Sequence, residues 1–202
     1  MLKMKRIKFP LLLACYIFFI LSDSCKKAGV AAATTPFQGP QNPSFENSGY
    51  WILETGYFGL FTYNTGTGFL PSQGTHYGTL TNYYPNGAAS TNYNVVNIYQ
   101  DGVDFSHSTT MTFDYTFTYA PYYLNMPASA SVTVQILFTA NGTVTLWQQT
   151  VNAATTPIQI KNNTITLPSL PSAGRLLIQL TAQGGPTFYP TGTFSIDNIR
   201  VN

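Results

Sequence analysis

Charged residues are scarce in this chain of 202 residues, at 8% of the total, while hydrophobic residues reach 44% and aromatic residues 15%. Soluble domains carry about 25% charged residues, and disordered segments combine low hydrophobicity with high net charge. The composition therefore argues against disorder. Nine lysines and arginines cannot form the clustered positive field of a nucleic-acid-binding module. A helical bundle is also disfavoured, because its exposed faces normally carry Glu, Lys and Arg.

The positive charge that the chain does have is concentrated in the first 24 residues. Four basic residues precede an apolar run, Leu11 to Leu21, which has the length of a secretory signal and is too short for a transmembrane helix. Removing residues 1–24 takes away four of the nine basic residues and one of the seven acidic ones, which leaves a net charge of −1. The basic balance thus belongs to the signal and predicts no nucleic-acid partner.

Cysteine is nearly absent, with Cys15 inside the apolar run and Cys25 just after it. The rest of the chain therefore has no disulfide framework and no thiol catalyst. The segment from Ser22 to Lys27 resembles a bacterial lipobox, although Asp23 is unusual before the Cys. We expect a lipid anchor at Cys25, which implies the cell envelope and the outer membrane of a Gram-negative bacterium. The alternative is a Cys left by ordinary signal cleavage.

Composition divides the remaining chain into two parts. Residues 25–41 are small side chains interrupted by two prolines, which is typical of a flexible tether. Residues 42–202 show no further shift in composition, no repeat and no block of charge. A segment of this length buries about 70% of its unfolded surface, so we expect a single domain.

Alternation of apolar and polar residues predicts that this domain is an antiparallel β-sandwich. Several strands place apolar residues at every second position, and Asn141-Gly142 predicts a hairpin between two of them. Eight or nine strands with Gly, Pro and Asn turns are typical of such a fold. The predicted inward residues are Phe113, Tyr115, Phe117, Tyr119, Val132, Val134, Ile136, Phe138, Val144, Leu146, Leu176, Ile178, Leu180, Phe194, Ile196 and Ile199.

The opposite phase of these strands predicts a polar outer face. Planar amide and carboxylate groups take paired sugar hydroxyls, and aromatic rings stack on the apolar face of a pyranose. The alternative is an ordinary solvated sheet face. The predicted polar side chains of this face are Gln100, Asp114, Thr116, Gln135 and Gln179.

Five short blocks, in order along the domain, resemble the carbohydrate-binding modules with the galactose-binding-like jelly-roll fold. The opening block is NPSFEN from Asn42, followed by Trp51, and the closing block is FSIDNIRV from Phe194. Between them lie QGTHY from Gln73, IYQD from Ile98 and MTFDY from Met111. The resemblance implies an antiparallel jelly roll and the binding of poly- or oligosaccharide.

Many such modules hold a structural calcium ion, and the resemblance implies Glu46 and Asp197 as its side-chain ligands. Calcium takes six to eight oxygen ligands, often carboxylates with carbonyls, so these residue types suit the role. The alternative is that Asp197 caps a neighbouring loop and that Glu46 pairs with Arg200.

Aromatic residues in turns are the further candidates for contact with sugar. Paired tyrosines lie beside prolines at Tyr83-Tyr84 and Tyr122-Tyr123. Trp147 lies on the polar phase of its strand and is therefore predicted to stack on a ligand, whereas Trp51 is predicted to lie in the core. Tyrosine is also a common structural residue in sandwiches, which is the alternative for each pair.

The sequence leaves three functions open. We expect non-catalytic carbohydrate binding by a lipid-anchored domain, serving a separate glycan-processing or transport system. The first alternative is an adhesive or structural surface protein that binds other proteins, which an exposed apolar strand edge would favour. The second is a glycosidase, but the sequence shows no pair of carboxylates at a telling position.

Overall fold

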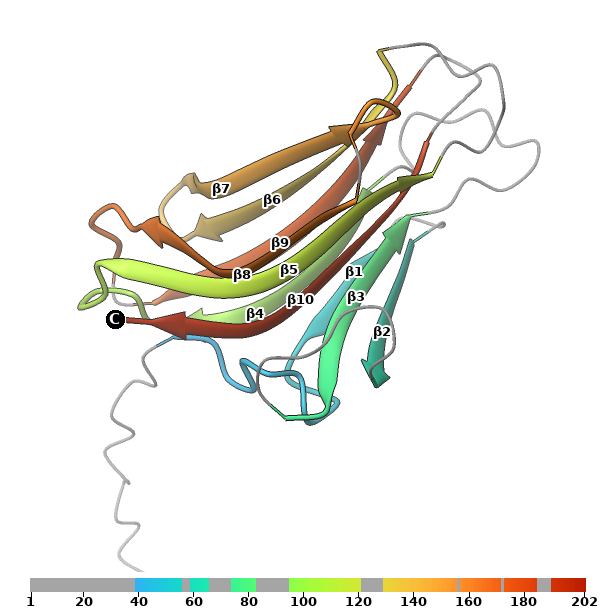
Figure 1. The fold of residues 1–202 in the computed structure, drawn as a ribbon. Coiled ribbons are helices and arrows are strands. Elements are labelled where there is room, and N and C mark those ends of the chain that lie inside the picture. The colour runs from blue at the N-terminus through green and yellow to red at the C-terminus, as the bar shows by residue number, and fades with distance from the viewer. Residues whose placement is uncertain are drawn as a thin grey trace, which may run out of the picture. The chain divides into compact units, whose positions relative to one another are not determined.

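The computed structural model describes residues 39–55, 59–65, 74–82, 95–120, 129–155, 157–171, 173–184 and 190–202. They belong to one compact unit, Pro36–Asn202. Every regular element in these ranges is a strand (Figure 1). Within them, no helix has the length and hydropathy needed to cross a membrane. The strands are β1 (Ile52–Thr55), β2 (Gly59–Thr65), β3 (His76–Asn82), β4 (Val95–Val103), β5 (Thr110–Ala120), β6 (Ser131–Thr139), β7 (Thr143–Asn152), β8 (Ile158–Thr166), β9 (Gly174–Gln183) and β10 (Thr191–Val201).

The strands form two five-stranded antiparallel sheets that pack face to face. The first sheet has the order β1-β4-β9-β6-β7, and the second has the order β2-β3-β10-β5-β8. From β3 to β10 the chain changes sheet at every connection except the β6–β7 hairpin, which is the strand order of a jelly roll. The predicted fold class is therefore confirmed.

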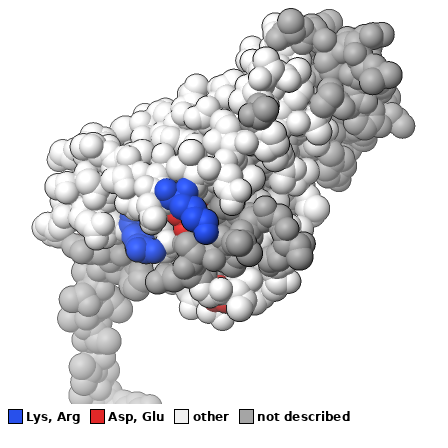
Figure 2. Space-filling view, in the orientation of Figure 1, with Lys and Arg blue, Asp and Glu red and all other residues white. Residues whose placement is uncertain are grey.

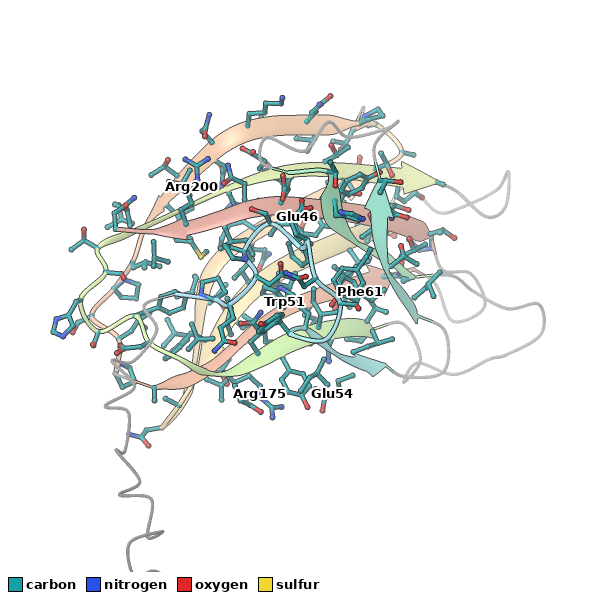
Figure 3. The ribbon with its side chains drawn as sticks, turned by 90° about the horizontal axis from the view of Figure 1, so that it is seen from below. Glu46, Trp51, Glu54, Phe61, Arg175 and Arg200 are labelled. Atoms are coloured by element: carbon teal, nitrogen blue, oxygen red, sulfur yellow. The ribbon has the colours of Figure 1, made fainter. Side chains whose placement is uncertain are left out.

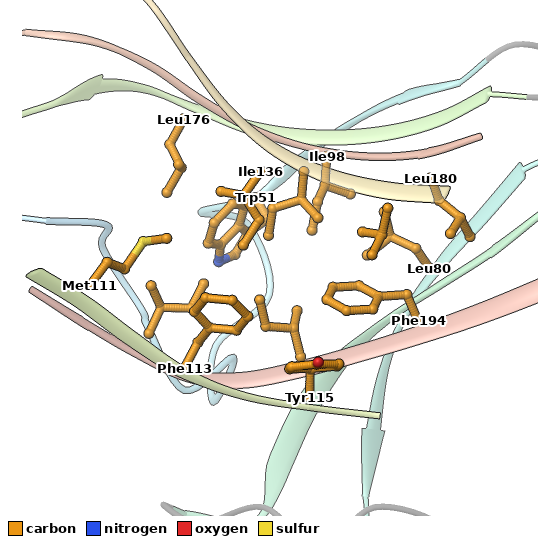
Figure 4. Close-up of a cluster of buried hydrophobic side chains, with 14 of the residues drawn as sticks. Trp51, Leu80, Ile98, Met111, Phe113, Tyr115, Ile136, Leu176, Leu180 and Phe194 are labelled. Carbon is orange, nitrogen blue, oxygen red and sulfur yellow. The ribbon is translucent and has the colours of Figure 1, made fainter. Parts of the chain in front are cut away.

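Most of the inward residues that alternation predicts lie in the core between the sheets, but Val144 is 39% exposed, and Tyr119 and Leu146 are only partly buried. Side chains of β5, β6, β9 and β10 meet there, together with Trp51, which is 4% exposed (Figure 4). The Asn141-Gly142 hairpin joins β6 to β7 as predicted.

The segment before β1 packs against the sandwich and extends the domain toward the predicted tether. The Gly39 amide donates to the Asp104 carbonyl at 3.0 Å, and the Phe45 ring stacks on Trp51 with centroids 5.2 Å apart. A side chain at Gly78 could not coexist with Phe45, since its Cβ would lie 2.6 Å from the ring. The described part of this segment, from Gly39 on, therefore contacts the body of the sandwich.

Candidate functional site

Gln100 does not belong to an outer face, which corrects the sequence prediction. It alternates with Val96 and Ile98 on the inner side of β4 and is 5% exposed. Its side-chain amide accepts from the Gln41 amide at 2.8 Å and donates to the Gln41 carbonyl at 2.6 Å. A buried amide needs such partners, so Gln100 holds the N-terminal segment against the body.

Asp114 is also closed to ligands, and the single predicted face is wrong, because Asp114 and Thr116 lie on β5 of the second sheet whereas Gln135 and Gln179 lie on the first. Its side chain is 0% exposed. The carboxylate accepts from the Asn162 amide and from the Asn198 side chain, the latter at 3.3 Å. Both asparagines have positive φ angles, 54° and 57°, and lie at irregularities in β8 and β10. Asp114 therefore fastens two bulges together, a structural role.

Trp147 points into the sandwich, so its predicted outward placement is wrong. Ile136 pairs with Trp147 while Leu137 pairs with Thr145, which leaves Leu146 as the extra residue of a β-bulge. The bulge reverses the alternation on its far side. The indole meets Tyr115 and Phe113 edge to face, at centroid distances of 4.9 and 5.1 Å.

Gln135 and Gln179 do lie on one outer face, and the strand register makes them neighbours. Gln179 of β9 pairs with Gln135 of β6 on one side and with Asn97 of β4 on the other. Gln135 pairs in turn with Gln148 of β7, and the two amides hydrogen-bond at 2.9 Å. We call this row of four amides, on the outside of the first sheet, the amide face. With Glu54 of β1, which pairs with Asn97, it crosses all five strands, about 19 Å.

Asn97 is the residue of this row that sequence reasoning missed. It alternates with the buried Val96 and Ile98 and so has the outward phase that would have revealed it. Its Oδ1 atom is buried and has no hydrogen-bond partner. A buried amide oxygen without a partner is costly, and no described residue supplies a donor to this atom.

An apolar row runs beside the amide face, two residues further along each strand. Tyr99 pairs with Leu177, which pairs with Leu137, and Ile52 of β1 pairs with Tyr99. Two residues of a strand span roughly 6.7 Å. The outer side of the first sheet thus carries a row of apolar side chains beside a row of planar amides, and both rows run perpendicular to the strands.

A charged cluster borders the apolar row. Arg175 donates from Nε and from a terminal nitrogen to the two carboxylate oxygens of Asp101, at 2.7 and 3.1 Å. Its guanidinium lies 3.8 Å from the centre of the Tyr99 ring. Glu54 belongs to the edge strand β1, and its carboxylate lies 3.9 Å from a terminal nitrogen of Arg175 (Figure 3). The hydrogen bond to Asp101 raises the pKa of Arg175. The positive charge of Arg175 is therefore already shared between the carboxylates of Asp101 and Glu54.

Glu46 makes hydrogen bonds that do not suit a calcium ligand. Its carboxylate accepts from the Thr75 and His76 amides at 2.7 and 2.9 Å, and it contacts the Thr75 hydroxyl and His76 Nδ1 at 3.2 and 3.1 Å. Calcium needs oxygen ligands around it, whereas these neighbours present N–H and O–H donors. In the described ranges no three acidic, His or Cys residues group to hold a metal. Arg200 donates to Asn198 at 2.6 Å, and the ion pair of Glu46 among the described residues is with His76, so the predicted alternative Glu46–Arg200 pair is wrong. Asp197 is 0% exposed.

The predicted tyrosines Tyr83, Tyr84, Tyr122 and Tyr123 lie outside the described residues, as does Cys25. The strand ends that precede the tyrosines are described. β3 ends at Asn82 and β5 at Ala120, and these residues pair with Gly192 and Thr191 at the start of β10. In the sequence, both tyrosine pairs therefore follow strands whose last residues lie at the same end of the second sheet, beside the start of β10.

The fold is a jelly-roll β-sandwich whose first sheet carries the amide face, the apolar row and a small charged cluster on its outer side. In the view of Figure 2, charged side chains form only small patches on the described surface. No family model matches the sequence, and no curated protein matches it either. Its structural neighbours include carbohydrate-binding modules with the jelly-roll fold.

One neighbour is a carbohydrate-binding module of family 28, specific for non-crystalline cellulose, with 13% identity and a TM-score of 0.49 over 82% of this chain and 97% of that one. A second is the N-terminal cellulose-binding domain of a Cellulomonas fimi β-1,4-glucanase, with 17% identity and a TM-score of 0.46 over 81% and 97% of the two chains. A third is the K2 cleaved adhesin domain of Lys-gingipain, with 12% identity and a TM-score of 0.44 over 79% and 96%. Likeness at this level concerns the fold and does not decide what this chain binds.

Proposed function

We propose that the chain is a non-catalytic carbohydrate-binding protein that holds a neutral glycan chain on the outer face of the first sheet. The observation that carries this proposal is the register that places four amides in one row beside a row of apolar side chains. Amides both donate to and accept from hydroxyls, and apolar surface covers the C–H face of a sugar ring. The two rows extend across the sheet, so an extended chain of several sugar units fits better than a single unit.

The charged cluster supports a neutral ligand. Arg175 is held by Asp101 and lies near Glu54, so the group of three carries one excess negative charge. A uronate or sulfated glycan would meet this excess, and the described strands of the first sheet offer no cation besides Arg175 to receive it, so like charges would oppose binding. Tyr83, Tyr84, Tyr122 and Tyr123 remain proposed as additional sugar contacts.

Affinity electrophoresis tests the function directly. The protein is run through gels that carry a soluble β-glucan, a xylan, a mannan or polygalacturonate. We expect retardation by at least one neutral polysaccharide and none by the polygalacturonate. Gln179→Ala should weaken the retained interaction about fivefold, the value of one lost net hydrogen bond.

Gln159→Ala is the matched control, because Gln159 is an exposed glutamine on β8 of the second sheet. It should leave retardation unchanged. Absence of retardation on every neutral glycan would overturn the proposal, and equal effects of both substitutions would overturn the assignment to the amide face.

A second candidate function, adhesion to protein, is favoured by one specific observation. Large apolar side chains are exposed on and beside the edge strands β1 and β2. Unpaired strand edges with apolar side chains promote association. The residues and their exposed fractions are Tyr50 46%, Ile52 47%, Leu53 41% and Leu60 49%. If adhesion is the function, a Leu53→Lys, Leu60→Lys variant should lose attachment to a protein-coated surface, and no glycan should retard the protein.

The membrane anchor is proposed from the sequence alone. Cys25, as the lipid-bearing residue, would place the domain in the cell envelope, beside a glycan-processing or transport partner. Labelled palmitate should be incorporated by the wild-type protein and not by Cys25→Ser. Incorporation into the Cys25→Ser variant would move the anchor elsewhere.

A further inference from the structure

The outer face of the second sheet contains a hollow of about 340 Å³, on the opposite side of the sandwich from the amide face. It is formed by four neighbouring strands, β2, β3, β10 and β5. Small-ligand sites have volumes of roughly 300–1,000 Å³, so the hollow is of a size for a small ligand only. Its lining residues are Asn64, Tyr77, Thr79, Thr116, Thr118, Thr193 and Ser195.

The hollow exists because short hydroxyl side chains occupy its floor. Thr79 of β3 pairs with Ser195 of β10, which pairs with Thr116 of β5. In the next outward register, Thr193 of β10 pairs with Thr118 of β5. Neighbouring strands lie about 4.8 Å apart. The floor is therefore a grid of hydroxyl groups, and longer side chains would have filled the same space.

The hydroxyls of the floor are only partly satisfied by one another. Thr79 and Ser195 hydrogen-bond at 3.0 Å, and the Thr118 hydroxyl donates to the Thr193 carbonyl at 3.4 Å. The Thr116 hydroxyl is buried and has no hydrogen-bond partner among the described residues. Such a group costs stability unless something supplies the missing hydrogen bond. A hydroxyl can both donate and accept, so a ligand that is itself a hydroxyl compound fits it.

The lining also excludes other classes of ligand. None of the described residues that line the hollow is Lys, Arg, Asp, Glu or His, so an ionic group would find no counter-charge among them. Its aromatic residue, Tyr77, is 8% exposed and offers little ring surface for stacking. The floor provides hydroxyls and the methyl groups of threonine. That combination complements a small neutral polyol.

We propose that this hollow is a second binding site, which takes one neutral sugar ring and works independently of the amide face. The amide face is long and takes a chain, whereas the hollow is a surface depression of about 340 Å³ and takes a single unit. A glycan with side branches or free ends could then contact both sides of the sandwich.

NMR titration of the protein with D-glucose, D-mannose and D-xylose tests this site. We expect saturable shifts of the methyl signals of Thr79, Thr116, Thr118 and Thr193 with at least one sugar. Thr116→Val keeps the branched shape and removes the hydroxyl, and it should weaken binding about fivefold. Ser195→Ala, a second variant, should weaken it similarly.

The matched control is Thr164→Val, because Thr164 forms a hydroxyl pair with Thr112 at 3.0 Å on the same sheet but outside the hollow. It should not change the affinity. No saturable shift in the hollow with any of the three sugars would overturn the proposal, as would equal effects of Thr164→Val and Thr116→Val. Because Gln179→Ala tests polysaccharide binding separately, failure of either site leaves the other measurable.

Discussion

The two outer faces of this sandwich both carry neutral polar side chains, but these side chains differ in length and in their neighbours. On the first sheet, Asn97, Gln179, Gln135 and Gln148 form a continuous row of long amides beside the row that contains Tyr99 and Leu177. On the second sheet, serine and threonine occupy the equivalent central positions and leave a hollow. The backbone geometry of the two sheets is the same, so the difference comes from side-chain length. In our proposals the long amides bind an extended glycan chain, and the short hydroxyl side chains leave room for one sugar ring.

Stability is also distributed differently between the faces. The second sheet carries a fully buried acid, Asp114, which joins two bulges at one end of its outer face. The amide face has no such fastening: its Gln135–Gln148 bond is an exposed side-chain contact. Substitutions on the first face should therefore change binding, and those at the Asp114 end of the second should change folding.

Asp114→Ala tests that distinction with the largest expected effect. The Asn162 amide and the Asn198 side chain would lose their acceptor in a buried site, which should lower the free energy of unfolding by about 3 kcal/mol. Urea denaturation measures this loss. Asp101→Ala, at a carboxylate that is 59% exposed, should cost less than about 1 kcal/mol. Unchanged stability with lost glycan binding would instead make Asp114 a ligand residue.

Leu177→Thr probes the apolar row. The substitution keeps a strand-forming residue and removes carbon surface from the middle of the row. We expect about fivefold weaker polysaccharide binding, since roughly 1 kcal/mol of apolar contact is lost. Leu60→Thr makes the same change on the second sheet and should leave binding unaffected in calorimetric titration. If Leu60→Thr weakened binding more than Leu177→Thr, the two faces would exchange roles.

The Glu46 contacts predict a modest pH effect. Burial alone would raise the pKa of Glu46, but hydrogen bonds from His76 and Thr75 outweigh it and hold the pKa below 4.5. The folded state then binds fewer protons than the unfolded state, so this contribution is present near neutral pH and is lost as pH falls below about 5. The difference in Tm between wild type and Glu46→Gln should shrink from about pH 5 to about pH 3. A difference in Tm that stayed constant over this pH range would contradict a lowered pKa of Glu46 in the folded state.

The smallest expected effect is that of calcium. Because hydrogen-bond donors surround Glu46, we expect equal Tm values in calcium and in EDTA. A ligand that binds only the folded state must raise its stability. A higher Tm in calcium would therefore restore the site at Glu46 and Asp197 that the resemblance implies.

The core could be predicted from the sequence because burial imposes strict alternation, as along β5, β6 and β9. Trp147 could not, because a single extra residue at Leu146 reverses the alternation without any local signal. Gln100 and Asp114 failed for another reason: their partners are 59 and 48 residues away in the chain. Only the three-dimensional packing shows that these polar residues are covered.

The candidate site also shows what the sequence could and could not predict. Gln135 and Gln179 have the outward phase that alternation predicts, but their adjacency depends on the register between β6 and β9. That register joins strands far apart in the sequence. The register between β4 and β9 likewise places Asn97 beside Gln179, and the alternation along β4 could have revealed the outward position of Asn97. Residue types therefore indicated the chemistry, and strand pairing assembled the surface.

Chemical-shift mapping with a retained neutral oligosaccharide tests the central claim most directly. The account predicts that the largest side-chain amide shifts occur at Asn97, Gln179 and Gln135, in one row across the first sheet. Large shifts confined to the second sheet, with these three amides unchanged, would contradict it.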